Sequence, residues 1–264
     1  MVLLVNKARV FFKRFVMPTL DSVLQLAHRL WIEEVVLAVN AELIIAANGQ
    51  LRFRFRDRPE GEIMTGRGFV REYINKSACD LVIGVPAGFR ALLTTSPYYR
   101  SSYVFVIPQW RGLKSVSFDS PELRTLKIGV QVLDENYAPP GTALARRGLQ
   151  SEIVGFDTTG QSADSIIRAV AKHKVDMAVV WGPLAGFFAQ RYGNTLRLIP
   201  VEPEVDPPGL PFTFAISMGV RKGNTVLHDH LETILSRRKQ EIDGILRDYG
   251  VPVLDSAARS GAGM

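Results

Sequence analysis

Between residues 127 and 201 the sequence alternates regularly between short apolar strands and helix-like segments. The predicted strands cover residues 127–133, 152–156, 176–180 and 196–201, and each is rich in β-branched or aromatic residues. The segments between them have helical spacing or follow turn residues such as Pro139-Pro140-Gly141. This alternation predicts strand–helix–strand units, a parallel sheet and an α/β fold class.

A second constraint comes from residues 79–106, where two apolar runs flank a polar loop. The first run, residues 81–83, stops at Gly84 and Pro86, and the second covers residues 103–107. The loop between them carries Tyr98, Tyr99, Arg100 and Ser101. Because loops leaving the carboxyl ends of strands bind ligands in open α/β sheets, we predict that these four residues line a binding site.

The chain is predicted to form two lobes joined by two crossing segments. We place the crossings near residues 106–110, where a linker-like segment follows to residue 121, and near residues 201–211. Lobe 1 then comprises residues 1–106 and 208–264, and lobe 2 comprises residues 107–207. The carboxyl-terminal part of lobe 1 contains a strand at 212–220 and one long amphipathic helix at 226–249. This is the layout of a hinge-closing binding protein.

Several classes of function are disfavoured by composition and motifs. No apolar run approaches the roughly 18 residues that a membrane span needs, so the chain is not expected to span a membrane. There is no P-loop, no Gly-x-Ser-x-Gly elbow and no histidine cluster, and the single Cys79 has no histidine near it in the sequence. We therefore expect no enzyme, no cofactor and no metal site.

The net charge of +6 leaves an acidic partner open. The basic residues are nevertheless dispersed among acids, which also fits an ordinary solvated surface. Nucleic acid is not an expected partner.

Five separated motifs in residues 67–253 carry a resemblance. They are CDLVIGVPAGFRALLTTSPYYRSSYVFV, ALARRGL, DMAVVWGPLAGFFAQR, LPFTFAISMGVRKG and EIDGILRDYGVP. Together they resemble the quinoprotein-dehydrogenase-associated, solute-binding-like proteins of the MoxJ/XoxJ type. The resemblance implies a two-lobe, type II periplasmic-binding-protein fold, a periplasmic location and a non-catalytic accessory role. The implied partner is a PQQ-dependent methanol dehydrogenase, with a lanthanide-dependent form left open, whose maturation or activation the protein would aid.

The amino-terminal 40 residues depart from this family pattern. Members of the family begin with a signal peptide and a strand and loop that form one wall of the cleft, and residues 1–40 match neither. The resemblance therefore rests on residues 67–253, and residues 1–40 carry no part of it.

Helix starts in lobe 2 supply further candidates for ligand contact, because backbone N–H groups at a helix start favour anions. The candidate segments are 140–142, 160–162 and 182–184, which include Thr142, Gly160, Gln161, Gly182 and Pro183. Each is equally what an ordinary connection between a strand and a helix looks like.

Arg100 and Trp181 each have two interpretations. Arg100 either clamps a carboxylate or pairs with a structural acid. Trp181 either stacks on a ligand or partner or packs in the core. Related lobes that hold an amino acid often have an acid at the position of Trp181, and an indole cannot replace it, which argues against a plain amino-acid ligand.

Two functions remain after these exclusions. One is the accessory role toward the dehydrogenase, with binding in or beside the gap between the lobes. The other is a solute receptor that delivers a small organic ligand to an ABC transporter.

Overall fold

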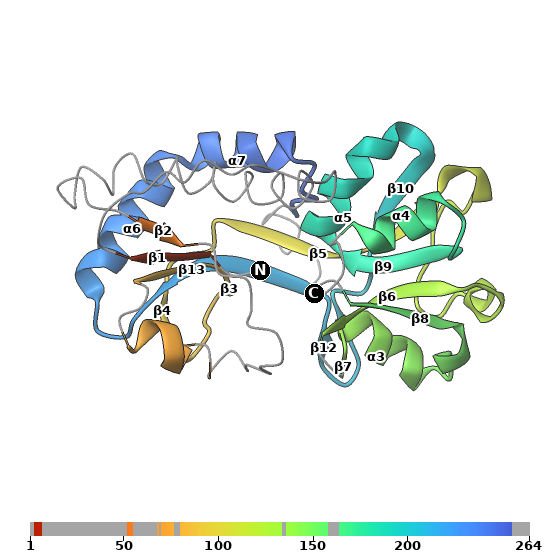
Figure 1. Ribbon diagram of the computed structural model, residues 1–264, viewed down its shortest axis with the longest axis horizontal. Helices are drawn as coiled ribbons and strands as arrows, with labels where there is room; N and C mark the ends of the chain where they lie inside the picture. Colours follow the sequence, from red (N-terminus) through yellow and green to blue (C-terminus); the bar gives the residue numbers. More distant parts are fainter. Residues whose placement is uncertain are drawn as a thin grey trace, which may run out of the picture. The chain divides into compact units, whose positions relative to one another are not determined.

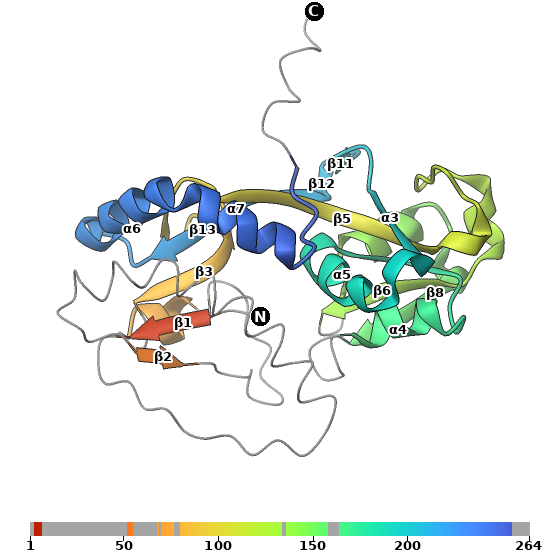
Figure 2. The same ribbon diagram turned by 90° about the horizontal axis from the view of Figure 1, so that it is seen from above.

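The computed structural model describes residues 3–6, 52–54, 68, 70–76, 80–133, 136–157 and 164–254. They fall into two compact units, drawn in two views in Figures 1 and 2. Unit 1 holds the described residues up to Arg100 together with Ala215–Ile245, and unit 2 holds Ser101–Phe214 and the described residues from Leu246 onward. The sequence-based division at 106/107 and 207/208 stays a prediction.

Three elements carry the chain from one unit into the other. They are β5 (Tyr99–Pro108), β13 (Thr213–Val220) and α7 (Lys239–Asp248). The two strands are neighbours in the strand order. The chain thus changes unit within regular secondary structure.

Unit 1 contains an antiparallel sheet in the order β2-β1-β3-β13, with β4 also paired to β13. Its other strands are β1 (Leu3–Asn6), β2 (Arg52–Arg54), β3 (Leu81–Pro86) and β4 (Leu93–Thr94). The predicted strand at 81–83 is confirmed as the buried start of β3. A single π-helical turn, η1 (Val70–Ile74), precedes β3, and its two ends are buried in the same small core as Val82 and Leu92.

Two helices follow β13, α6 (Thr225–Arg237) and α7. The side chain of Asn224 caps the first of them by accepting the N–H of Leu227 at 3.3 Å. The prediction of one long helix was wrong, because the chain leaves helical geometry at Arg238. The buried residues Leu231, Leu235, Ile242 and Leu246 keep helical spacing across the break, so periodicity could not reveal it.

His228 of α6 contacts the end of β4. Its imidazole interacts with Asp229 (2.9 Å), the Thr94 carbonyl oxygen (3.3 Å) and Glu232 (3.6 Å), and Glu232 accepts the N–H of Ser96. The hydrogen bond to Asp229, helped by Thr94 and Glu232, raises the pKa of His228 above its ordinary value of 6.5.

We expect the free energy of unfolding to fall with rising pH at this histidine. A raised pKa means that the charged imidazole stabilises the folded state fully below about pH 6.5, and that this contribution is lost as pH rises through the folded-state pKa. The imidazole is partly exposed, so the change should stay below about 1 kcal/mol. Urea unfolding of the wild type and of His228→Gln between about pH 5.5 and 8.5 measures it. Parallel pH profiles of the two proteins would contradict the assignment.

Unit 2 contains a mixed sheet with β9 (Met177–Trp181) at its centre, between β5 and β6 (Ile128–Leu133). β10 (Leu196–Pro200) pairs with the other side of β5. β8 (Ile153–Asp157) and β7 (Asn136–Tyr137) pair with β6. β6, β8 and β9 are parallel, as predicted. The remaining pairs, β5 with β9, β5 with β10 and β6 with β7, are antiparallel.

The prediction of a wholly parallel sheet was therefore wrong. β10 has the same direction as β9, as a strand–helix–strand unit requires, because both are antiparallel to β5. Its neighbour, however, is β5, which enters this unit from unit 1 in the opposite direction. A sequence pattern gives the direction of successive strands and not the strand inserted between them.

Helices cover both faces of this sheet. Figure 1 draws α4 and α5 on one side and α3 on the other. Their bounds are α3 (Pro139–Arg146), α4 (Ser165–Ala171) and α5 (Gly182–Ala189). The short 3-10 turns are η2 (Gln109–Arg111), η3 (Pro121–Thr125), η4 (Gln150–Glu152) and η5 (Gln190–Thr195), and the hairpin strands are β11 (Val205–Asp206) and β12 (Leu210–Pro211).

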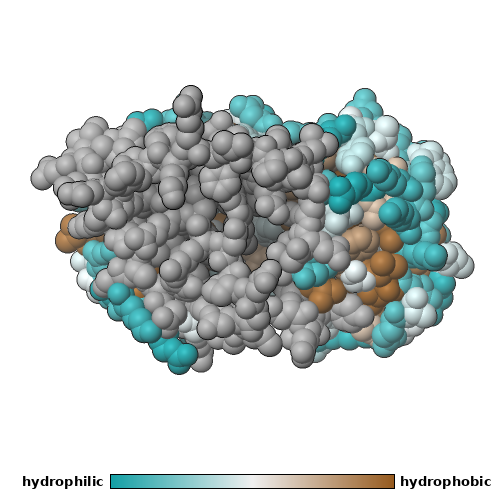
Figure 3. Space-filling view, in the orientation of Figure 1, coloured by the Kyte–Doolittle hydropathy of each residue, from teal (hydrophilic) through white to brown (hydrophobic). Residues whose placement is uncertain are grey.

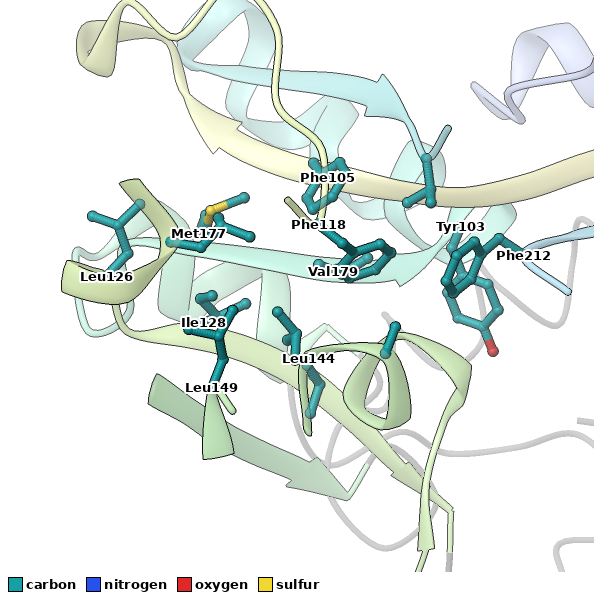
Figure 4. Packing of buried hydrophobic residues seen from close by; sticks show 14 of the residues in the cluster. Tyr103, Phe105, Phe118, Leu126, Ile128, Leu144, Leu149, Met177, Val179 and Phe212 are labelled. Atoms are coloured by element: carbon teal, nitrogen blue, oxygen red, sulfur yellow. The ribbon is translucent and has the colours of Figure 1, made fainter. Parts of the chain in front are cut away.

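Alternate residues of β5 and β9 feed the two cores. Phe105 and Val179 lie in one hydrophobic cluster with Leu144 of α3, shown in Figure 4. Val104 and Val180 lie in the other cluster, with residues of α4 and α5. This period of two explains why both strands read as continuous apolar runs, since both faces are covered.

The segment 108–121 is part of this unit and its prediction as a linker was wrong. Phe118 is only 3% exposed and packs its ring 5.2 Å from Phe105 and 4.9 Å from Phe212. Its prolines and glycine suggested a linker because Leu113, Val116 and Phe118, which pack in the core, do not follow one helix or strand period.

On the face seen in Figure 3, hydrophobic residues of the described surface gather where Figure 1 draws β6 and β8. Within the described residues, none of the helices is long and apolar enough to cross a bilayer.

Candidate functional site

The parallel strands of unit 2 end at one edge of the sheet, and this edge is the candidate site. β6, β8 and β9 run in the same direction, so their carboxyl ends meet there. α5 begins directly after β9, and α3 begins shortly after β6. Thr142, Trp181, Gly182 and Pro183 lie at this edge, whereas Gly160 and Gln161 fall outside the described residues.

Trp181, the last residue of β9, is held in a fixed orientation at the edge. Its indole meets the Tyr103 ring edge-to-face at a centroid distance of 5.5 Å and the Phe214 ring at 5.7 Å. Its backbone N–H donates to Oε1 of Gln131 at 2.8 Å. The indole remains partly exposed, so this aromatic group is both ordered and accessible.

The surroundings of Trp181 are apolar. Tyr103 is its direct strand partner and only 8% exposed, and burial raises the pKa of the Tyr103 phenol to about 12. Gln131 is 7% exposed on β6. These groups are neutral at physiological pH, so the edge at Trp181 is suited to apolar and aromatic contacts rather than to acid–base chemistry.

Sequence reasoning missed Tyr103, Phe214 and Gln131 as parts of this site. A signal existed for Gln131, because it is the one polar side chain within the apolar run of residues 128–133. Phe214 gave no such signal, since its position beside Trp181 depends on a strand that returns from a distant part of the chain.

The start of α3 offers few backbone donors. Pro139 and Pro140 carry no N–H, and the N–H groups of Gly141 and Thr142 both point at the Ala138 carbonyl oxygen, at 2.9 and 3.3 Å. An anion site made of main-chain amides is therefore poorly supplied here. Contact between a ligand and Thr142 stays a prediction that rests on its hydroxyl.

Ser101 and Gly182 are tied to the segment around Pro252. Ser101 is fully buried, and its hydroxyl donates to the Pro252 carbonyl oxygen at 2.7 Å. A Cβ on Gly182 would lie 2.5 Å from the Ser102 carbonyl oxygen and 2.7 Å from Cγ of Pro252. The absence of a side chain at Gly182, followed by the buried Pro183, thus allows α5 to start against β5 and this segment.

Tyr98, Tyr99 and Arg100 belong to unit 1, and their prediction as loop residues was wrong for two of them. β5 already begins at Tyr99, so Tyr99 and Arg100 are strand residues, as is Ser101 from the same predicted loop, and Tyr98 precedes the strand. The rings of Tyr98 and Tyr99 meet edge-to-face at 5.0 Å, and burial raises the pKa of both phenols. The hypothesis that these residues and Trp181 face a common gap stays a prediction.

Among the described residues, no group of three or more histidine, cysteine or acidic side chains is gathered in a way that could hold a metal ion. Cys79 lies outside the described residues.

Comparisons with known proteins bear on what such a site serves. No protein-family model matches the chain. Protein MoxJ of Methylorubrum extorquens is 31% identical over 201 residues, which are 70% of this chain and 66% of that protein, just under two thirds of its length. Protein MoxJ of Paracoccus denitrificans is 30% identical over 211 residues, which are 71% of this chain and 72% of that protein. The crystal structure of the periplasmic binding protein XoxJ from Methylobacterium extorquens AM1 aligns at 30% identity with a TM-score of 0.64, over 85% of this chain and 90% of that one.

Proposed function

Because the chain belongs to the MoxJ/XoxJ family of periplasmic binding proteins, we propose that it is a non-catalytic accessory protein of a PQQ-dependent methanol dehydrogenase. The family ties the chain to a binding role in methanol oxidation, and the type II periplasmic-binding-protein fold expected from the sequence is confirmed. The accessory role, the dehydrogenase as partner and the periplasm as its place of action are our proposal. In this role the protein binds the dehydrogenase and aids its maturation or activation.

The ordered Trp181 at the strand edge is the observation that carries this proposal. A tryptophan fixed by two rings and a buried glutamine, with part of its surface accessible, has the features of a binding anchor, since large aromatic side chains dominate protein–protein affinity. The neighbouring groups add apolar area and no charge. A partner's apolar side chain fits such an edge better than a charged solute does.

The solute-receptor alternative finds less support at the start of α3. Receptors for small anions use main-chain amides at helix starts, and here two prolines and the Ala138 carbonyl leave few of them. The outcome that would favour a receptor is a rise in melting temperature with a small organic ligand.

We expect the purified protein to bind the methanol dehydrogenase of the same organism and the Trp181→Ala variant to bind it at least about tenfold more weakly. The physical reason is the loss of a buried aromatic anchor, which is typically worth about 2 kcal/mol or more at an interface. Biolayer interferometry with the apo and the PQQ-loaded dehydrogenase measures both affinities. It also tells which form of the dehydrogenase the protein prefers.

Phe187→Ala is the matched control, because it also removes a partly buried ring from unit 2, one that stacks on Tyr249 away from Trp181. Each variant is first checked for cooperative unfolding. A wild-type protein that is folded and yet has no affinity for either form of the dehydrogenase would refute the accessory role.

A further inference from the structure

Trp110 stands out on the surface of unit 2. It lies in η2, directly after β5, and 63% of its surface is exposed. An indole is among the side chains that gain most from burial, although single exposed apolar residues are common and mean little alone. What distinguishes Trp110 is the arrangement of its neighbours.

Two neighbouring side chains contact the indole of Trp110. The Arg111 guanidinium lies 4.9 Å from its centroid, and the His173 ring lies 5.4 Å from it. Arg111 is itself anchored by an ion pair with Asp176, whose other carboxylate oxygen accepts the N–H of Lys127 at 2.7 Å. A side chain that is already ordered loses little entropy when a partner covers it.

His173 occupies a position at which the backbone favours glycine. Its φ is 54°, and it is the one non-glycine residue with a positive φ among the described residues. It directly follows Lys172, the C-cap of α4, and its N–H donates to the Val170 carbonyl oxygen at 3.1 Å. A left-handed conformation costs about 1–2 kcal/mol for a residue with a Cβ. His173 therefore carries its side chain at a position that disfavours one, and this side chain contacts the Trp110 ring.

The charge around this aromatic pair is positive. Lys172 and Lys174, both exposed, flank His173 in the sequence. The acid beside them, Asp176, is already engaged by Arg111 and by the Lys127 N–H. A complementary partner therefore carries carboxylates around an apolar side chain.

We propose that Trp110, Arg111, Lys172, His173 and Lys174 form a second contact surface, the Trp110 surface, for an acidic patch of the dehydrogenase. This inference rests on the proposed function. The surface lies at the opposite end of β5 and β9 from Trp181, because Tyr103 pairs with Trp181 whereas Val106 already pairs with Ala178. The two anchors thus engage separate parts of one large partner.

A protein partner suits this surface better than nucleic acid or lipid. Single-stranded nucleic acid needs a basic groove with several stacking rings. The Trp110 surface has a single indole for such stacking. Insertion into a membrane interface needs a wider apolar face, whereas Trp110 is flanked by the polar Gln109 and Arg111.

The test measures association and dissociation rates with the dehydrogenase. We expect Trp110→Ala to weaken binding about tenfold, mainly through faster dissociation. Lys172→Glu combined with Lys174→Glu should slow association several-fold and flatten its salt dependence between about 0.01 and 0.15 M, because long-range attraction is screened over that range. His173→Gly should leave the melting temperature unchanged or raised while weakening binding, a combination that a purely structural role does not produce.

Val226→Ala and Lys222→Glu serve as controls, since Val226 is 69% exposed and Lys222 is an exposed cation, both in unit 1. Unchanged rates for the Trp110 surface variants, or losses equal to those of the controls, overturn the inference and leave the proposed function standing if the wild type binds. A wild type that does not bind overturns both. Trp110-dependent binding to a single-stranded oligonucleotide, or to vesicles of phosphatidylcholine and phosphatidylglycerol, overturns the inference in favour of that class of partner.

Discussion

Gly186→Ala is expected to destabilise unit 2 by about 3 kcal/mol or more, a large part of the 5–15 kcal/mol that holds a typical domain folded. A Cβ on Gly186 would lie 2.8 Å from the Gly250 carbonyl carbon and closer still to its oxygen, and 3.2 Å from Cδ of Pro252. The obstacle is backbone, which no rotamer change can move aside. The segment beyond α7 must therefore separate from α5 or α5 must shift.

Further contacts hold both α5 and the segment around Gly250 in position, so a shift of either one would cost additional free energy. Gly250, at a φ of 67°, ends α7 and itself lacks room for a side chain, since a Cβ there would lie 2.7 Å from Nε2 of Gln190. That amide donates to the Asp248 carbonyl oxygen at 3.0 Å. Phe187 stacks on Tyr249 at 5.7 Å.

Gly244→Ala is the matched control, because Gly244 lies in the helix α7 and a Cβ there meets nothing within 4 Å. It should be neutral or stabilise by up to about 1 kcal/mol, the difference in helix propensity between the two residues. Urea unfolding of the three proteins measures the contrast. Equal midpoints for Gly186→Ala and Gly244→Ala would show that α5 and the segment around Gly250 do not pack in this way.

The second large effect is expected from Arg147→Met, at about 3–5 kcal/mol. Asp206, in the hairpin of β11 and β12, is only 2% exposed and accepts a hydrogen bond from Nη2 of Arg147 at 2.6 Å. This bond, with a second one to Asp119, raises the pKa of the Arg147 guanidinium. Removing the arginine leaves a buried carboxylate with Arg146 at 3.7 Å as its remaining cation, and breaking a buried pair from one side is strongly destabilising.

Asp119→Asn provides the comparison, because Asp119 pairs with the same arginine at 2.7 Å but its side chain is 75% exposed. Its loss should change the free energy of unfolding by less than about 1 kcal/mol, as is usual for an exposed ion pair. The difference between the two variants shows how much more the free energy of unfolding depends on the pair with buried Asp206 than on the pair with exposed Asp119. Chemical denaturation of both variants measures their free energies of unfolding. A decrease for Arg147→Met as small as that for Asp119→Asn would mean that the hairpin does not depend on the pair with Asp206.

The sequence was informative wherever a strand or helix is defined by its own residues. β6, β8, β9 and β13 lie within a residue or two of their predicted positions, and the α/β class follows from them. Errors arose where a distant segment decides the outcome. The insertion of β5 between β9 and β10, and the burial of Phe118 between Phe105 and Phe212, are set by strands far away in the chain.

The candidate site was only partly visible for the same reason. Trp181 and Gly182 could be singled out from the sequence because they directly follow the apolar run predicted as a strand at 176–180. Their partners could not, since Gln131, Phe214 and Pro252 come from three separate segments. Ser101 was chosen as a polar loop residue, whereas its hydroxyl is directed at the Pro252 carbonyl within the protein.

The contact of Gly250 and Pro252 with α5 also has a consequence for the timing of folding. The described part of unit 2 begins at Ser101, yet residues 249–252 contribute a surface against which α5 packs. During translation, residues 249–252 must therefore leave the ribosome before this contact with α5 can form.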